Sequence, residues 1–268
     1  MTNPIYTTTN CHKPAYQLNW SYAIFWHDRP KDYAWIAGLK EASEKDDIRI
    51  LQHRFKEPNR SQFLISTRPD VVPQTMVQRV KGRLQHLIRD RMPKAFQRNY
   101  GLRSVGSTRR DKLEDYLASQ LGHHPMADSR VTERLARFQI NDPRVDLSRA
   151  RRTSHARYWY NLHIVIVNDG RHMESREDVL YEMQQMIINS ARAKDHWLSR
   201  AAIVPDHVHL AVGCKLEEAP SDVALAYLNN LAYARGMTEV FRYGYYVGTF
   251  SEYDLRVIPR PDECSVSA

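Results

Sequence analysis

The two halves of the chain carry the same kinds of segments in the same order, and this repetition constrains the fold more than any single motif. Five segments correspond at nearly constant shifts in residue number. The aromatic run Trp20–Trp26 corresponds to Tyr158–Val167, and Tyr100-Gly101 corresponds to Tyr243-Gly244. Because apolar alternation and helix-like spacing recur in both halves, the sequence predicts one α+β module present twice. The alternative is two unrelated α+β domains of similar size.

A pair of histidines distinguishes the second half from the first. His207 and His209 lie in the run PDHVHLAV, whereas the first half has Ser61 and Phe63 at the matching place, in SQFLIS. Two residues two apart on a strand point to the same face, so the imidazoles can bind one divalent cation. Asp206 is placed to orient one imidazole. The alternative is a pair of half-buried strand histidines hydrogen-bonded to the backbone.

A tyrosine and a glutamine distinguish the first half from the second. Tyr116 and Gln120 lie four apart in LEDYLASQ, whereas the second half ends in VIPRPDECSVSA, without a tyrosine. Residues at i and i+4 share one face of a helix. A tyrosine hydroxyl there can attack phosphorus, and the amide oxygen of the glutamine can reach a metal. The alternative is a buried tyrosine on an amphipathic helix.

Length and composition allow two ordinary domains. The chain has 268 residues, 42% of them apolar, which suffices for two cores. We expect a first domain at 1–121, a linker with some helix at 122–157, and a second domain at 158–268. The polar N-terminus lacks a signal peptide pattern, and no apolar run is long enough to cross a membrane. Three scattered cysteines, Cys11, Cys214 and Cys264, argue against a disulfide framework and predict a cytoplasmic protein.

The positive charge of the chain is concentrated in three runs. The net charge is +8, with basic runs at Arg79–Arg91, Arg103–Lys112 and Arg144–Arg157. A polyanionic partner explains such runs, and a solvated basic face is the alternative. Bases of nucleic acids stack on aromatic side chains, so interleaved tyrosines favour nucleic acid. These tyrosines are Tyr100, Tyr243, Tyr245 and Tyr246.

Apolar patterns predict the elements of each module. In the first half we expect strands at 20–26, 48–55 and 61–66, and helices at 33–45, 75–90 and 110–121. In the second half we expect strands at 158–167, 197–203 and 207–212, and helices at 176–193 and 221–235. Pro93 is expected to end the helix at 75–90, and Gly122 to cap the helix at 110–121. The order predicts the α+β class, with two ferredoxin-like units of antiparallel sheet plus helices.

Together, these residues resemble the single-tyrosine HUH transposases, which move insertion sequences as single-stranded DNA, and the related REP-associated tyrosine transposases. The resemblance lies in PDHVHLAV, in Lys81-Gly82 of the basic helix, in the YG…SVG segment and in YLASQ. It implies dimers in which the tyrosine helix of one subunit completes the histidine site of the other. A fused tandem copy is then a monomer that acts as an internal pseudo-dimer. The departure is that the parts of the site are divided between two copies.

The resemblance also implies a mechanism. His207, His209 and Gln120 would hold Mg²⁺ or Mn²⁺, and Tyr116 would attack the scissile phosphate to give a 5′-phosphotyrosine. The partner would be single-stranded or hairpin DNA. The second composite site, without histidines or tyrosine, would be inactive, so a domesticated nickase fits as well as a transposase. The residues expected to contact DNA are Lys81, Arg83, Arg89, Arg109, Arg110, Tyr245 and Tyr246.

Two other functions remain open from the sequence. One is a catalytically silent protein that binds single-stranded or hairpin DNA with the same basic surface, as a regulator. The other is an RNA-binding protein that stacks bases on a ferredoxin-like sheet. The complementary set of two histidines, a tyrosine and a glutamine favours the enzyme, because drift would not preserve one full set divided between two copies.

Overall fold

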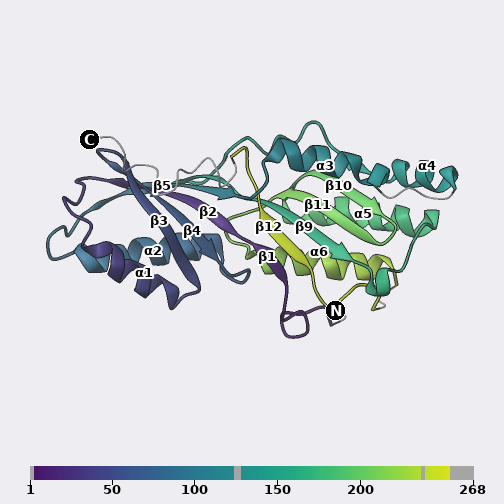
Figure 1. Ribbon diagram of the computed structural model, residues 1–268, viewed down its shortest axis with the longest axis horizontal. Coiled ribbons are helices and arrows are strands. Elements are labelled where there is room, and N and C mark those ends of the chain that lie inside the picture. The colour runs from purple at the N-terminus through teal and green to yellow at the C-terminus, as the bar shows by residue number, and fades with distance from the viewer. Residues whose placement is uncertain (1–2, 124–127, 237–238, 254–268) are drawn as a thin grey trace.

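The computed structural model describes residues 3–123, 128–236 and 239–253 as an elongated α+β molecule (Figure 1). Cys264 and the C-terminal run VIPRPDECSVSA lie outside the described residues. The helices are α1 (Trp35–Glu44), α2 (Pro73–Ile88), α3 (Arg110–His123), α4 (Ser129–Arg137), α5 (Glu177–Lys194), α6 (Pro220–Ala234) and the short 3-10 helix η1 (Asp169–Arg171). The strands are β1 (Ala15–Gln17), β2 (Asn19–Trp26), β3 (Ile48–Glu57), β4 (Arg60–Thr67), β5 (Phe96–Val105), β6 (Ile140–Asn141), β7 (Arg151–Arg152), β8 (Ala156–Trp159), β9 (Asn161–Val167), β10 (Trp197–Val204), β11 (His207–Gly213) and β12 (Tyr246–Thr249).

The strands form two sheets that lie side by side along the long axis (Figure 1). The first sheet has the order β3-β4-β2-β5-β8-β7, and the second has the order β1-β12-β9-β11-β10-β6. In β2, alternate residues Trp20, Tyr22, Ile24 and Trp26 are fully buried, as expected for a strand with one face on a core. Helices α1 and α2 lie on that side of the first sheet (Figure 1).

Each sheet contains the same succession of four antiparallel strands and two helices. In the first unit the chain runs β2-α1-β3-β4-α2-β5, and in the second it runs β9-α5-β10-β11-α6-β12. In both sheets the strands of the unit lie in the order second, third, first and fourth. The second strand is the end strand of the first sheet, whereas in the second sheet β6 pairs outside it. This arrangement is compatible with two ferredoxin-like units.

The hairpins β3–β4 and β10–β11 are paired in a similar way, although β3 has a second irregularity between Phe55 and Glu57 that β10 lacks. Each has a bulge early in its first strand, after Ile50 and after Leu198 respectively. Each closes through a two-residue turn, with Glu57 opposite Arg60 in one hairpin and Val204 opposite His207 in the other. The register of the first hairpin can therefore be transferred directly to the second.

This register corrects the correspondence expected from the sequence. Counted from the turns, Arg60 and Gln62 occupy the places of the two histidines, whereas Ser61 and Phe63 are one residue out of step. Ser61 and Phe63 are fully buried on the core face. Because strand residues alternate between faces, a shift of one residue moves every side chain to the other side of the sheet. The assignment of Ser61 and Phe63 is therefore wrong.

The two units exchange strands. Strand β1, just before β2, pairs in parallel with β12 of the other sheet. Strand β8, just before β9, pairs in parallel with β5 of the first sheet. The segment expected as one strand at 158–167 is thus divided at Tyr160 between the two sheets. This exchange was not predicted, because each short strand is indistinguishable in sequence from the start of the strand that follows it.

The junction between the sheets repeats one set of hydrogen bonds in both directions. The backbone N–H of Asn19 donates to the Thr249 hydroxyl at 2.9 Å, and that hydroxyl donates to the Val105 carbonyl at 2.6 Å. In the opposite direction, the backbone N–H of Asn161 donates to the Ser104 hydroxyl, which donates to the Phe250 carbonyl. These bonds satisfy buried backbone groups where one strand leaves each sheet.

Smaller differences from the expected elements concern helix ends. Helix α2 ends at Ile88, before Pro93, and α3 continues through Gly122 to His123. The helix expected in the linker is present as α4. Within the described ranges, no helix combines the length and apolar character that crossing a bilayer requires.

Candidate functional site

Helix α3 belongs in sequence to the first unit but packs on the second sheet. Its residues Leu113, Leu117 and Gln120 recur at helical spacing and are all buried. The two leucines share an apolar cluster with Ala202, Ala211, Leu147 and Phe250, which come from the second half and the segment before it. The helix therefore lies on the face of the second sheet opposite α5 and α6, because Val208, Leu210 and Val212 pack into the main core.

This packing brings Tyr116 to the histidine pair. His207 and His209 lie on the same face of β11 as Ala211, beneath α3. The Tyr116 ring stands edge-on to the His209 ring, with centroids 5.6 Å apart, and the two histidine rings are 4.7 Å apart. Tyr116 is 45% exposed, whereas both histidines are buried. A partly exposed tyrosine thus lies against one ring of a buried histidine pair.

Asp206 orients His207, as its position before the pair suggested. Its carboxylate lies 2.6 Å from His207 Nδ1 and accepts a second bond from Arg171 at 2.7 Å. Burial by itself would raise the pKa of Asp206, but these two hydrogen bonds hold it below its ordinary value. A carboxylate in this position favours the tautomer of His207 that carries its proton on Nδ1.

His163 on β9 is a third histidine of the site, and the sequence analysis missed it. Its Nε2 lies 3.0 Å from His209 Nδ1, and the rings stack with centroids 5.2 Å apart. Burial lowers the pKa of His163 to about 4, so its imidazole is neutral at physiological pH. The sequence placed His163 on an expected strand of the same unit as His207 and His209. Only the pairing of β9 with β11 shows that these histidines lie close together.

Gln120 lies one helical turn beyond Tyr116 and is 2% exposed. Its amide nitrogen donates to the Tyr116 carbonyl at 3.3 Å. Beside Tyr116, a cavity of about 380 Å³ is lined by Leu113, His163, Tyr246 and the segment Ser107-Thr108, with Gln17 from β1. The site therefore combines side chains from the N-terminal strand, both units and the helix between them.

Most of the residues expected to contact DNA are engaged within the protein. The guanidinium of Arg83 pairs with Asp46, and the Lys81 ammonium donates to the Gln97 carbonyl at 2.6 Å. Arg109 pairs with Asp111 at 2.8 Å. Arg110 lies near Glu114 and Asp146, and the exposed Arg89 lies near Asp90. Because of these contacts, the basic side chains on α2 and at the start of α3 are less available to bind phosphate groups.

The two expected stacking tyrosines differ in exposure. Tyr245 is 6% exposed and belongs to the core cluster, so it does not offer a ring face to a base, and its assignment to DNA contact is corrected. Burial raises its pKa well above the ordinary value. Tyr246 is half-buried and stands edge-on to His163, with centroids 5.6 Å apart. It remains a candidate contact inside the site.

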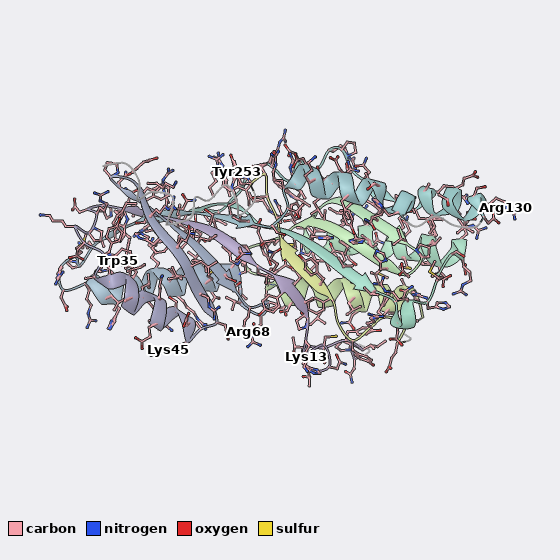
Figure 2. The ribbon with its side chains drawn as sticks, in the orientation of Figure 1. Lys13, Trp35, Lys45, Arg68, Arg130 and Tyr253 are labelled. Carbon is pink, nitrogen blue, oxygen red and sulfur yellow. The ribbon has the colours of Figure 1, made fainter. Side chains whose placement is uncertain are left out.

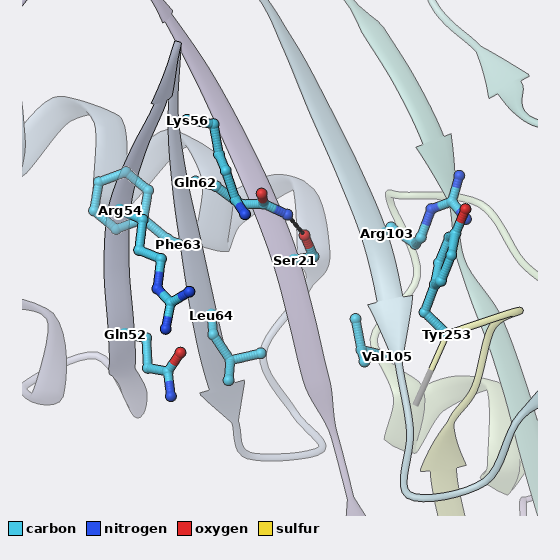
Figure 3. Close-up of a pocket in the computed structure, with 10 residues that line it drawn as sticks. All are labelled: Ser21, Gln52, Arg54, Lys56, Gln62, Phe63, Leu64, Arg103, Val105 and Tyr253. Carbon is cyan, nitrogen blue, oxygen red and sulfur yellow. Dashed lines mark hydrogen bonds between the residues drawn. The ribbon is translucent and has the colours of Figure 1, made fainter. Parts of the chain in front are cut away.

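The chain after β12 crosses in the opposite direction to α3. Arg103 of the first sheet pairs with Glu252 at 2.7 Å. Its guanidinium lies 5.1 Å from the ring of Tyr253 (Figure 3), a residue that is also labelled in Figure 2. Where the two crossing segments meet, Arg109 and Ser251 form an isolated parallel bridge. Each unit thus sends the segment after its last strand toward the sheet of the other.

Two comparisons with known proteins bear on these observations. No curated protein matches the chain significantly. A family model described as "Transposase IS200 like" matches residues 28–120. The match covers most of the first unit and ends at Gln120, in the helix that carries Tyr116, and it does not reach the histidine pair. This family indicates a transposase-type function on DNA and in general uses a divalent metal. Residues 28–120 of the chain are therefore similar to the IS200-like transposase family.

Proposed function

We propose that this protein is a metal-dependent single-stranded DNA nuclease or strand transferase with one composite active site. The observation that carries the proposal is the contact between Tyr116 and His209, whose ring centroids lie 5.6 Å apart although the residues come from different units. Neither half contains the set alone.

We propose that residues of the site hold a divalent cation. Among the described residues, no group of three or more histidine, cysteine or acidic side chains forms a metal site. The proposed donors are instead His207, His209 and the amide oxygen of Gln120. The Nδ1 atoms of the two histidines face Asp206 and His163, so Nε2 of each is the atom proposed for the metal. A bound cation would act as a Lewis acid on the scissile phosphate.

The chemical step assigned to the chain is an in-line attack by Tyr116. A bond forms between its oxygen and phosphorus, and the bond from phosphorus to the 3′ oxygen breaks with its electron pair. The Tyr116 hydroxyl releases its proton to solvent, and the departing 3′ oxygen takes one up, so the products are a 5′-phosphotyrosine and a 3′-hydroxyl. The intermediate conserves a phosphodiester bond, so attack by a hydroxyl can rejoin the strand. We keep the DNA-binding role of Tyr246 and Arg89 as part of this proposal.

We further propose that the two units act as an internal pseudo-dimer within a monomer. The reciprocal hydrogen bonds of Asn19 with Thr249 and of Asn161 with Ser104 support this view, as do the exchanged strands β1 and β8. The domains would be 1–121 and 158–268, joined by 122–157, with α3 exchanged. With Arg60 and Gln62 at the places of the histidines, the first sheet would lack a metal site, so each chain would cleave once.

A trapping experiment tests the proposal. The purified protein is incubated with single-stranded oligonucleotides and Mg²⁺ or Mn²⁺, and covalent adducts are separated under denaturing conditions. Peptide mapping should locate the DNA on Tyr116, at the 5′ end of the downstream fragment. Tight binding without any adduct, over a range of sequences and hairpins, would instead support a silent DNA-binding protein.

A further inference from the structure

The first sheet has an open face that carries a basic cleft. The cleft has a volume of about 550 Å³ and lies over β2, β4 and β5 and the hairpin β7–β8, on the side away from α1 and α2. No residue of a helix lines it. Its cations are Arg60, Arg103, Arg152 and Arg157, with His155 at the rim, and no carboxylate is among its lining residues.

A second hollow continues the cleft across the same face (Figure 3). Its volume is about 250 Å³, and it shares Ser21, Gln62 and Arg103 with the basic cleft. It adds Arg54 and Lys56 from β3, again without a carboxylate in its lining. The two hollows together place positive side chains along one continuous path over the first sheet, from β3 to β7.

The charges of the path are only partly compensated. Arg60 pairs with Glu57, and Arg103 with Glu252, each at 2.7 Å. Arg152 and Arg157 are exposed, and within the described part of the chain no ion pair joins either to a carboxylate. Exposed arginines lining a concave surface without nearby acids create a field that attracts phosphate groups.

An aromatic side chain lies between the arginines. Trp159 is half-buried, and its indole N–H donates to the Ser148 carbonyl at 2.7 Å, which holds the ring in place. The guanidinium of Arg103 lies 3.8 Å from the Trp159 ring, and that of Arg157 lies 5.0 Å from it. Guanidinium planes and indole rings stack on unpaired bases, whereas paired bases offer no free face.

This face is the counterpart of the candidate active site in the second unit. The hairpin register sets Gln62 at the place of His209, and the strand pairing sets Ser21 at the place of His163. Gln62 donates to the Ser21 hydroxyl at 2.6 Å, where the second unit has the contact between His209 and His163 (Figure 3). The position and the hydrogen bond persist, but the metal-binding groups are replaced by an amide and an arginine.

We propose that the basic cleft is a second, non-catalytic binding site for single-stranded DNA, which holds the phosphate backbone through Arg152 and Arg157. The inference rests on the proposed function in taking DNA as the partner, but the binding does not require cleavage. A strand cleaved at the composite site would be retained on the neighbouring sheet of the same chain. The face of the first sheet that corresponds to the histidine-bearing face of the second sheet would thus bind the substrate without cleaving it.

The test compares two variants that lose the same charge. The cleft variant carries Arg152→Gln and Arg157→Gln, and the control carries Lys40→Gln and Arg192→Gln, on exposed outer positions of α1 and α5. Fluorescence anisotropy with a single-stranded oligonucleotide is measured over a series of salt concentrations. We expect at least a tenfold weaker affinity for the cleft variant at low salt. The dependence of log affinity on log salt should become shallower by about 1.4, at about 0.7 per lost contact.

The control should bind like the wild type, and thermal melting verifies that both variants fold. Arg152→Gln alone, at an exposed position, should lose part of the affinity if the double variant is unstable. Affinity and salt dependence equal to those of the control would overturn the proposal, as would a loss seen equally with duplex DNA.

The outcome is distinguishable from failure of the proposed function. At saturating DNA, the cleft variant should still form the adduct on Tyr116, because neither arginine belongs to the composite site. If the cleft variant forms the adduct and binds DNA with unchanged affinity, the proposal for the cleft is wrong and the proposed function is unaffected. If the wild type never forms an adduct and the cleft variant still binds DNA more weakly, the cleft is a DNA-binding site and the proposed enzymatic function is wrong.

Discussion

Tyr116 and His209 meet edge to face, with ring centroids 5.6 Å apart, although 93 positions of sequence and the junction between the units separate them. The contact exists because Leu113 and Leu117 anchor α3 on the second sheet. A nucleophile on a helix that is held by the other unit can be separated from the histidines without unfolding either sheet. The relation between this helix and the second sheet therefore decides whether the site is assembled.

Replacing Tyr116 by phenylalanine should abolish the covalent adduct while changing DNA affinity less than about threefold, since only one exposed hydroxyl is lost. Tyr181→Phe, at another exposed tyrosine on α5, is the matched control and should form the adduct normally. Denaturing electrophoresis with labelled DNA measures both. Adduct formation by Tyr116→Phe would show that the nucleophile is a different residue.

Replacing His209 or His207 by alanine should remove metal-dependent cleavage and weaken Mn²⁺ binding, measured by isothermal titration calorimetry. His163→Ala should weaken Mn²⁺ binding about 10–100-fold, because the residue that orients a ligand typically has an effect of this size. His86→Ala, on the exposed side of α2, should leave the titration unchanged. Equal metal affinity in all four proteins would exclude the histidine pair as the metal site.

Leu117→Ala should destabilise the protein by about 2–5 kcal/mol, because it opens a cavity among Leu113, Ala211 and Phe250. The same change should lower the rate of adduct formation, since it weakens the attachment of α3. Denaturant unfolding provides the stability, and Leu87→Ala, at a position 42% exposed, should cost less than about 1 kcal/mol. If Leu117→Ala shows the expected destabilisation but forms the adduct at the wild-type rate, the attachment of α3 does not limit adduct formation.

Gly106→Ala should be destabilising by about 1–3 kcal/mol, because a Cβ there would overlap the Thr249 carbonyl oxygen and crowd the Phe250 backbone. The close approach lies where the segment leading to α3 passes β12. Gly82 in α2 has no atom within 4 Å of such a Cβ, so Gly82→Ala should instead stabilise the helix by about 0.5–1 kcal/mol. Thermal unfolding of the two variants should therefore shift in opposite directions.

Acid should destabilise the first unit through His53. Burial lowers the pKa of His53 to about 4 from its ordinary value of 6.5. Between these values the unfolded chain binds a proton that the folded chain does not, so stability falls as pH drops from about 6.5 toward 4 and is unaffected above this window. The loss should be on the order of 1 kcal/mol, allowing for partial exposure. His53→Gln should flatten the pH dependence of the melting temperature, and an identical slope in both proteins would refute the assignment.

The elements were predictable because their patterns are local. The alternation of Trp20, Tyr22, Ile24 and Trp26 marks a half-buried strand, and the spacing of apolar residues in 75–90 marks a helix. The register was not predictable to one residue, because Ser61-Gln62-Phe63 has no polar pair to align with the histidines. Only the turns and bulges of the two hairpins set Arg60 and Gln62 at those places.

The sequence by itself determined the residue types of the site and their local spacing, since His207 and His209 must share a strand face and Tyr116 and Gln120 a helix face. Tertiary structure alone decided that these faces meet, that His163 contacts His209, that Arg83 pairs with Asp46 and that Tyr245 is buried. The physical reason is that periodicity fixes which residues point together within one element. Which elements meet depends on strand exchange and the packing of α3, contacts between residues far apart in the chain.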